Sequence, residues 1–184
     1  MSIKRINKED TILVVIDIQE RLIPVMAEKD EVIVAVKKLV AGFETIDSPI
    51  LVTQQYTKGL GETIEEIRSS FKEFSYMEKS AFSVMGDADC VRVLKDSGRK
   101  TVILCGIESH VCVLQTALDM IEQGYDVFLT VDGVSSRHLV DEENAIKRML
   151  FSGVITTTAE SVLFELLDND SKSDTFKAIS KIVK

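Results

Sequence analysis

Short runs of continuous apolar residues alternate along the chain with longer stretches in which apolar residues recur every three or four positions. A run that is apolar at nearly every position is typical of a parallel strand covered on both faces. A short, weaker strand candidate lies at 74–78. The stronger strand candidates, all rich in Val, Ile and Leu, are 11–17, 49–54, 101–105, 125–131 and 153–157.

The stretches between these runs have the periodicity of amphipathic helices. Residues 31–46 show it well, because their apolar side chains fall on one stripe made of Val32, Val36, Leu39, Val40 and Phe43. The other predicted helices are 62–72, 87–97, 111–123, 140–151 and 159–168. Three of them are followed by a glycine, a residue that commonly ends a helix in the left-handed conformation: Gly98, Gly124 and Gly153.

Strands that alternate with helices predict a parallel sheet with right-handed crossover connections. We therefore expect an α/β fold with a doubly wound, mostly parallel six-stranded sheet in the order 3-2-1-4-5-6 and helices on both faces. The chain has 184 residues, a length typical of one domain, and we predict a single domain over 1–184. Its amphipathic tail, 169–184, is expected to pack on this domain or on a neighbouring subunit.

Charge and cysteine content narrow the range of functions. The net charge of -8 disfavours a nucleic-acid partner. No segment has the apolar length of a membrane span, and the first ten residues lack the apolar stretch of a secretion signal. Three cysteines that form no C-x-x-C pair indicate free thiols in a reducing compartment. We therefore expect a cytoplasmic protein that acts on a small molecule, with no nucleic-acid or membrane partner.

The predicted sheet order brings two reactive side chains together. The first and fourth strands are neighbours, and ligands bind where their carboxyl ends meet. Asp17 ends the first strand and Cys112 follows the fourth, so that a carboxylate and a thiol converge there. The start of helix 111–123 favours a thiolate at Cys112. The alternatives are that Cys112 is a small buried apolar residue and that Asp17 is a capping residue.

Lys79 has a weaker signal, because most lysines are solvated surface residues. It follows the short third strand, at the same edge of the sheet as Asp17. A buried ammonium there would hold both Asp17 and a thiolate in their charged forms. The other two cysteines are expected to be core residues, since Cys105 lies within an apolar strand and Cys90 lies on the apolar stripe of a helix.

The two histidines give no signal for a Cys-His pair or for a metal site. His110 precedes Cys112 by two residues at a helix start, so their side chains diverge. His138 lies in a loop-like stretch, where a surface position is the simpler interpretation. No pair of histidines has metal-ligand spacing, and we expect neither a metal nor another cofactor.

Four segments, in this order and spacing, resemble the isochorismatase-like cysteine hydrolases: 15–19, 53–61, 78–82 and 106–112. The resemblance spans about residues 8–168 and is greatest to the small subgroup without an assigned physiological substrate. It implies a catalytic triad of Asp17, Lys79 and Cys112. It also implies a cis peptide between Ile107 and Glu108, and an oxyanion hole made by the backbone N–H groups of Glu108 and Cys112.

The resemblance implies hydrolysis of a small amide-type or ester substrate through a thioester on Cys112. The segment 54–56 lacks the metal ligands of nicotinamidases, and isochorismatases proper need no cysteine. Gln19, Gln55 and Tyr56 are candidates for the substrate pocket, and a homo-oligomer of two or more chains is expected. The alternative functions are a catalytically idle binding protein and a thiol redox protein on the same fold.

Overall fold

The computed structural model describes residues 3–167 and 172–184. Its strands form one sheet in the order β3-β2-β1-β4-β5-β6, and every neighbouring pair is parallel. This confirms the doubly wound order predicted from the sequence. The strands are β1 (Thr11–Ile16), β2 (Ile50–Gln55), β3 (Met77–Lys79), β4 (Thr101–Ile107), β5 (Asp126–Ser135) and β6 (Ile155–Thr157).

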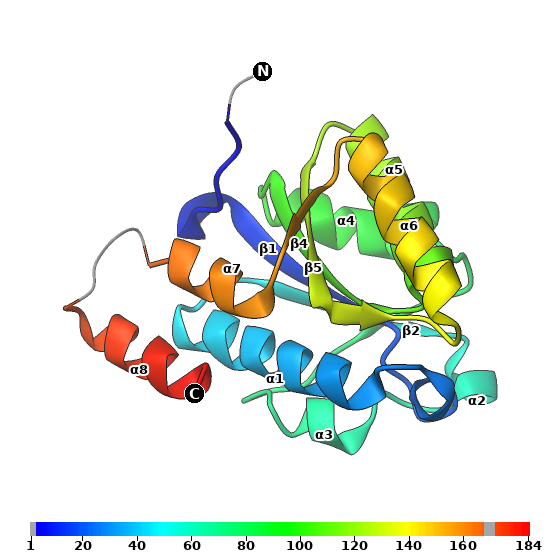
Figure 1. The fold of residues 1–184 in the computed structure, drawn as a ribbon, viewed down its shortest axis with the longest axis horizontal. Coiled ribbons are helices and arrows are strands. Elements are labelled where there is room, and N and C mark those ends of the chain that lie inside the picture. Colours follow the sequence, from blue (N-terminus) through cyan, green and yellow to red (C-terminus); the bar gives the residue numbers. More distant parts are fainter. Residues whose placement is uncertain (1–2, 168–171) are drawn as a thin grey trace.

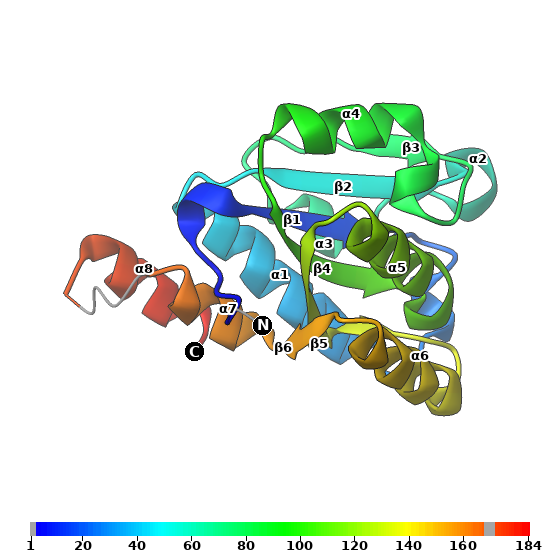
Figure 2. The ribbon, with the colours of Figure 1, turned by 90° about the horizontal axis from the view of Figure 1, so that it is seen from above.

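Helices cover both faces of the sheet (Figures 1 and 2). On one face lie α1 (Lys29–Thr45), α3 (Glu65–Arg68), α7 (Ala159–Glu165) and α8 (Asp174–Ile182). On the other lie α4 (Ala88–Asp96), α5 (Leu114–Glu122) and α6 (Leu139–Phe151). The short α2 (Thr57–Leu60) follows β2 at the carboxyl edge of the sheet.

The central apolar runs form strands because their side chains pack alternately into the cores on the two faces of the sheet. In β1, Leu13 and Val15 pack in the core beneath α1, whereas Val14 and Ile16 pack in the core beneath α4 and α5. All six residues of β1 are buried. Burial of each aliphatic side chain stabilises the fold by about 1.5–3 kcal/mol relative to exposure. The buried central strands therefore fix the positions of the residues that follow their carboxyl ends, such as Asp17 after β1.

The short third strand begins three residues later than predicted, at Met77 instead of residue 74. Two predicted helices also differ in the structure. The helix predicted at 62–72 is only the single turn α3, because Thr63 bridges to Gln19 and the Ile64 N–H donates to the carbonyl of Ile18, which keeps the chain extended there. The helix predicted at 111–123 begins with a π-helical turn, Ser109–Val113, and continues as α5. Cys112 therefore lies in the π-helical turn and not in the first turn of an α-helix.

The tail packs on its own chain, which was one of the two expected positions. Ile179 of α8 is only 1% exposed and belongs to the core beneath α1. The Phe176 ring lies 6.3 Å from that of Phe164, and the Lys38 ammonium donates to the carbonyl of Val183 over 3.0 Å. Residues 168–171, at the end of the predicted helix 159–168 and in the start of the tail, lie outside the described residues.

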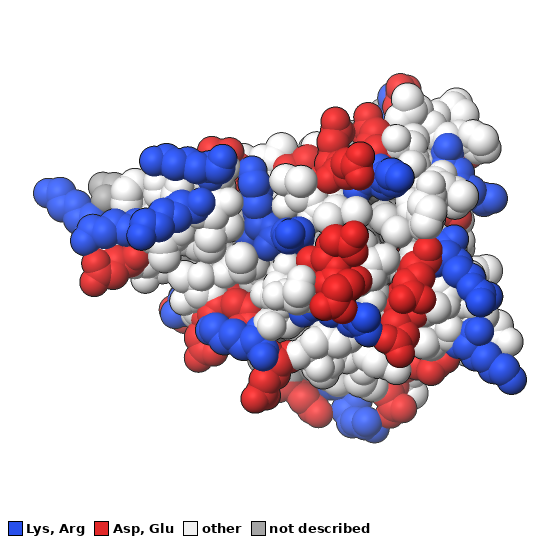
Figure 3. Space-filling model, turned by 90° about the horizontal axis from the view of Figure 1, so that it is seen from below, with Lys and Arg blue, Asp and Glu red and all other residues white. Residues whose placement is uncertain are grey.

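The surface carries charges of both signs. On the face drawn in Figure 3, acidic and basic side chains are interspersed, with lysines and arginines gathered toward the end that carries α8. In the ranges that the structure describes, no helix has the length and apolar character needed to cross a membrane.

Candidate functional site

Asp17, Lys79 and Cys112 lie together at the carboxyl edge of the sheet. Asp17 follows β1, Lys79 ends β3, and Cys112 follows β4. The Lys79 ammonium reaches past the end of β2 and donates to Asp17 Oδ2 over 2.7 Å, with both side chains fully buried. Cys112 is 6% exposed, and its thiol is close enough to both charges for each to act on its pKa. The structure thus brings the three predicted side chains into one site.

The Asp17 carboxylate is held by groups from two strands. Its backbone has a φ of +53°, a left-handed conformation that costs a non-glycine residue on the order of 1–3 kcal/mol. The Asp17 N–H donates to the carbonyl of Thr53 over 3.2 Å, and the Thr53 hydroxyl donates to Oδ1 over 2.8 Å. Both carboxylate oxygens therefore have a donor. The sequence analysis did not single out Thr53, although its place near the end of β2, beside Asp17, was a usable signal.

The Lys79 ammonium is surrounded by oxygen atoms. Besides Asp17, its acceptors are Gln55 Oε1 at 2.8 Å and the carbonyls of Ala81 and Phe82 at 3.2 and 3.1 Å. A charge taken out of water is tolerated only when such partners replace its hydration. The arrangement therefore keeps a buried cation beside a carboxylate and a thiol.

The Cys112 thiol is protonated at rest. Its pKa is raised to about 12, first by burial and then by the negative charge of Asp17, while the positive charge of Lys79 partly opposes both effects. The sequence argument for a thiolate at a helix N-terminus is therefore wrong in direction. Burial and the nearby carboxylate outweigh the helix terminus, which here is a π-helical turn.

A tight turn delivers Cys112 to the site. Gly106 has a φ of +118° and lies so close to β1 that an added Cβ would stand 2.1 Å from the carbonyl oxygen of Ile16. The next peptide bond, between Ile107 and Glu108, is cis. The Glu108 carboxylate accepts from Arg137 Nε over 2.9 Å. The oxyanion role of the Glu108 and Cys112 N–H groups stays a prediction.

The three predicted pocket residues differ in what they contact. Gln19 is fully buried, and its amide donates to the carbonyls of Gln55 and Gly61 and accepts from the Gln55 N–H. This corrects its assignment: Gln19 holds the loop after β2 and has no free group for a substrate. Gln55 joins the charge network by bonding Lys79 and the carbonyl of Ser80. Tyr56 is 56% exposed at the rim of the site.

The remaining cysteines are core residues, although Lys79 and Asp17 are minor influences on the pKa of Cys90. Cys90 and Cys105 are fully buried, which confirms them as core residues. Burial raises the pKa of each, that of Cys90 to about 12. His110 turns toward the end of β5, with Nδ1 2.9 Å from the Ser136 hydroxyl, and His138 is exposed just before α6.

Gln54 lies in the segment 54–56, which the resemblance compares with the metal-binding segment of nicotinamidases. It is buried, donates to the Thr63 hydroxyl over 3.0 Å and accepts from the Thr57 hydroxyl over 3.0 Å. Within residues 3–167 and 172–184, no group of three or more His, Cys, Asp or Glu side chains is arranged to hold a metal ion. The amide of Gln54 therefore holds the loop after β2 through Thr57 and Thr63. The side chains of this segment do not form a set of metal ligands.

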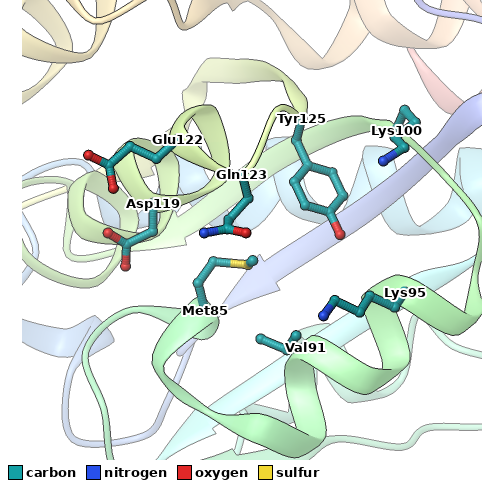
Figure 4. A pocket seen from close by; sticks show the side chains of 8 residues that line it. All are labelled: Met85, Val91, Lys95, Lys100, Asp119, Glu122, Gln123 and Tyr125. Atoms are coloured by element: carbon teal, nitrogen blue, oxygen red, sulfur yellow. The ribbon is translucent and has the colours of Figure 1, made fainter.

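A hollow of about 430 Å³ lies elsewhere, between α4 and α5 (Figure 4). Lys100 and Tyr125 immediately precede β4 and β5, so this hollow opens toward the amino edge of the sheet, away from Asp17. Figure 4 shows Asp119 and Glu122 on one side and the two lysines on the other, with the Tyr125 ring beside them. The full lining is Met85, Val91, Lys95, Lys100, Asp119, Glu122, Gln123 and Tyr125, which includes no nucleophile of the kind found at Cys112.

Comparison with known proteins identifies the family and the fold of the chain. Residues 11–161 match the Isochorismatase domain family. The chain belongs to the isochorismatase family. The Isochorismatase domain-containing protein 2A of Mus musculus is 36% identical to the chain over 183 residues, with 100% of this chain and 87% of the mouse protein covered.

Two further curated members of the isochorismatase family differ in length and setting. The Isochorismatase domain-containing protein 1 of Salmo salar is 33% identical over 95% of this chain, which spans 61% of that protein's length. The Secreted isochorismatase effector Isc1 of Phytophthora sojae is 35% identical, covering 98% of this chain and 87% of its own length.

Solved structures of the family superpose closely. The MAR1 ribonuclease of Caenorhabditis elegans has a TM-score of 0.91 at 36% identity, covering 98% of this chain and 92% of its own. The YcaC product of Escherichia coli, described as an octameric hydrolase of unknown specificity, has a TM-score of 0.91 at 25% identity, covering 99% and 90%. YcaC from Pseudomonas aeruginosa, solved with hexane-2,5-diol and covalent acrylamide, has a TM-score of 0.92 at 25% identity, covering 100% and 92%.

Proposed function

We propose that this member of the isochorismatase family is a cysteine hydrolase that cleaves a small non-peptide amide or an ester through a thioester on Cys112. The observation that carries the proposal is the fully buried Asp17–Lys79 ion pair beside the Cys112 thiol. A nucleophile, a base within reach of its proton and a group that orients the base form the general pattern of nucleophilic catalysis.

In the first step Cys112 Sγ attacks the carbonyl carbon while the Asp17 carboxylate takes the thiol proton. Because burial and the charge of Asp17 raise the pKa of the thiol, we propose that proton transfer to Asp17 accompanies the attack. The carbonyl π electrons move to oxygen, and the backbone N–H groups of Glu108 and Cys112 stabilise the oxyanion. An oxyanion-hole donor is typically worth about 3–4 kcal/mol.

In the second step the oxyanion re-forms the carbonyl and the C–N or C–O bond breaks. Protonated Asp17 gives its proton to the departing amine or alcohol, which leaves a thioester on Cys112. Asp17 then takes a proton from water as the water oxygen attacks the thioester. The C–S bond breaks, the sulfur recovers the proton, and a carboxylic acid leaves. Lys79 stays charged throughout and holds Asp17 in place over 2.7 Å.

Two solved relatives support this class of chemistry. The Pseudomonas aeruginosa protein was solved with covalent acrylamide, which indicates a reactive nucleophile in that protein, and the Escherichia coli protein is described as a hydrolase. We propose that the reaction here needs no metal, because the chain supplies its own nucleophile and base at the site.

A second candidate activity is cleavage of RNA, since the Caenorhabditis elegans relative is named a ribonuclease. The net charge of -8 disfavours binding of RNA, whose backbone carries a negative charge at every phosphodiester. A buried thiol–carboxylate pair also suits attack on a carbonyl better than attack on a phosphodiester. RNA therefore belongs in the substrate panel as a competing outcome.

The test is turnover on a panel of small amides, esters and RNA by the wild-type protein and by Cys112→Ala, Asp17→Asn and Cys90→Ala variants. Intact-protein mass spectrometry follows any acyl adduct. We expect Cys112→Ala and Asp17→Asn to lose hydrolysis and Cys90→Ala, a second buried thiol, to retain it. Amide or ester turnover that survives in Cys112→Ala overturns the thioester mechanism. Reversible oxidation of Cys112 without any hydrolysis supports a redox protein, and an inert Cys112 without turnover supports an idle fold.

We also propose a cytoplasmic, self-associating protein. Three buried free cysteines support a reducing compartment, and the octameric Escherichia coli relative supports self-association. Since the Phytophthora sojae relative is named a secreted effector, subcellular fractionation is the direct test of location.

A further inference from the structure

Helix α6 turns an apolar face to solvent at the edge of the molecule. Ala145 and Met149 face the core beneath the helix and are buried. On the outer side, the exposed fractions are 51% for Leu139, 72% for Val140, 46% for Leu150 and 94% for Phe151. Figure 2 shows α6 beside α5, with no element of the described chain beyond it.

The outer face of α6 is symmetrical about Ala145. Leu139 and Phe151 are equally far from Ala145 along the helix, and so are Val140 and Leu150. Glu143 and Lys147 are also equally spaced about it, and they form an exposed ion pair of 3.3 Å. With 3.6 residues per turn, these six side chains fall within an arc of about 120° centred opposite Ala145.

We propose that this face is a twofold self-association surface, on which α6 of a second copy packs antiparallel. A twofold axis at the level of Ala145 places Leu139 of one copy against Phe151 of the other, and Val140 against Leu150. It also places Glu143 of each copy beside Lys147 of the other, so that the central charges are complementary. An isologous interface requires this self-complementarity, whereas a face for an unrelated protein does not.

The inference gives a location to the expected self-association and is independent of the hydrolytic chemistry. A helix of 13 residues is about 20 Å long. A contact of that length covers less than the roughly 800 Å² per partner of a standard interface. We therefore expect the assembly to depend on protein concentration.

Charge reversal provides the sharpest test, with mass measured by analytical ultracentrifugation over a wide concentration range. Lys147→Glu places glutamates against glutamates across the axis, and Glu143→Lys places lysines against lysines. We expect each variant alone to have a lower mass than the wild type. Mixing the two variants restores opposite charges at both contacts, and we expect the mass to recover. Arg92→Glu, at an exposed ion pair on α4, is the matched control and leaves the mass unchanged.

The apolar part of the surface is tested separately. A Val140→Ser, Phe151→Ser double variant is expected to lower the mass, while Val34→Ser, at a valine 53% exposed on α1, is not. Unchanged thermal unfolding shows that each variant is folded. The proposal is overturned by a wild type that is monomeric at every concentration, by a mass that is insensitive to these substitutions, or by mixed variants that fail to reassociate. Hydrolysis is assayed separately on the same variants. A failure of the self-association proposal therefore does not affect the proposed hydrolase activity, and the reverse also holds.

Discussion

At the scale of single residues, the site depends on two charges that stabilise each other. Asp17 and Lys79 are fully buried, and within the described residues neither forms an ion pair with another residue of opposite charge. Removal of one partner from a buried pair leaves an uncompensated charge, which costs more than the pair itself contributes. The same pair acts in opposite directions on the pKa of Cys112.

Asp17→Asn is expected to raise the reactivity of Cys112 while abolishing hydrolysis. Asp17 is the largest electrostatic cause that raises the pKa of the thiol, whereas Lys79 lowers it. Without the carboxylate the pKa falls, and the thiolate fraction below that pKa rises roughly tenfold per pKa unit. Alkylation therefore accelerates, by less than this factor because a thiolate of lower pKa is a weaker nucleophile. Alkylation by iodoacetamide at neutral pH, followed by mass spectrometry, measures this effect. Alkylation no faster than in the wild type contradicts the account of Cys112.

Lys79→Met is expected to destabilise the fold by about 3–5 kcal/mol, because Asp17 stays buried without its cation. Urea unfolding measures the change. Lys177→Met removes a salt-bridged lysine that is 66% exposed, and it should alter stability by no more than about 0.5 kcal/mol. Adding Asp17→Asn to Lys79→Met should recover part of the loss. A Lys79→Met protein as stable as the control argues against a buried ion pair.

At the scale of elements, the close approach of β4 to β1 positions the turn that carries Cys112. Gly106 pairs with Ile16 in the parallel ladder, and its missing side chain lets β4 approach β1 closely there. The following turn then returns toward Asp17 through Glu108 and the π-helical segment. The geometry of the site is therefore a property of the β1–β4 junction.

Gly106→Ala should destabilise the protein by at least about 3 kcal/mol, because the new Cβ meets the Ile16 carbonyl oxygen at 2.1 Å and the φ of +118° disfavours a side chain. Gly98→Ala is the matched control. Its φ is +68°, but nothing lies within 4 Å of the added Cβ, so we expect a cost of only about 1 kcal/mol. Denaturant unfolding compares the two, and equal midpoints contradict the close approach.

At the scale of the whole molecule, three free thiols are buried in the two cores. Burial raises the pKa of Cys90, Cys105 and Cys112 from their ordinary value near 9.0. Below pH 9 both the folded and the unfolded chains hold these protons. Above it, the unfolded chain releases protons that the folded chain keeps, so unfolding becomes more favourable.

We therefore expect stability to fall as the pH rises above about 9. Each thiol that ionises only on unfolding contributes about 1.4 kcal/mol per pH unit to the slope. Urea unfolding of the wild type and of Cys105→Ala across this range measures it. The variant is less stable overall because of its cavity, but its slope should be smaller by one proton. Identical slopes contradict a protonated, buried Cys105.

The sequence predicted most of the architecture and part of the site. Continuous apolar runs identified the strands, since a strand covered on both faces has few polar positions. Asp17 and Cys112 were found because the sheet order brings the ends of its first and fourth strands together. The helix predicted at 62–72 is only the turn Glu65–Arg68, and the bridge between Thr63 and Gln19 keeps the start of the segment extended despite its apolar spacing.

The sequence by itself determined the strand order and the edge at which the chemistry gathers, because the periodicity of apolar residues records which faces are buried. Only the tertiary structure decided the state and role of each side chain there. Burial keeps the thiol of Cys112 protonated. Contacts between separate segments occupy the amide of Gln19 and direct the Thr53 hydroxyl to Asp17. The spacing of residues along the chain carries no information about burial or about these contacts, because both arise only when distant segments exclude water from a shared site.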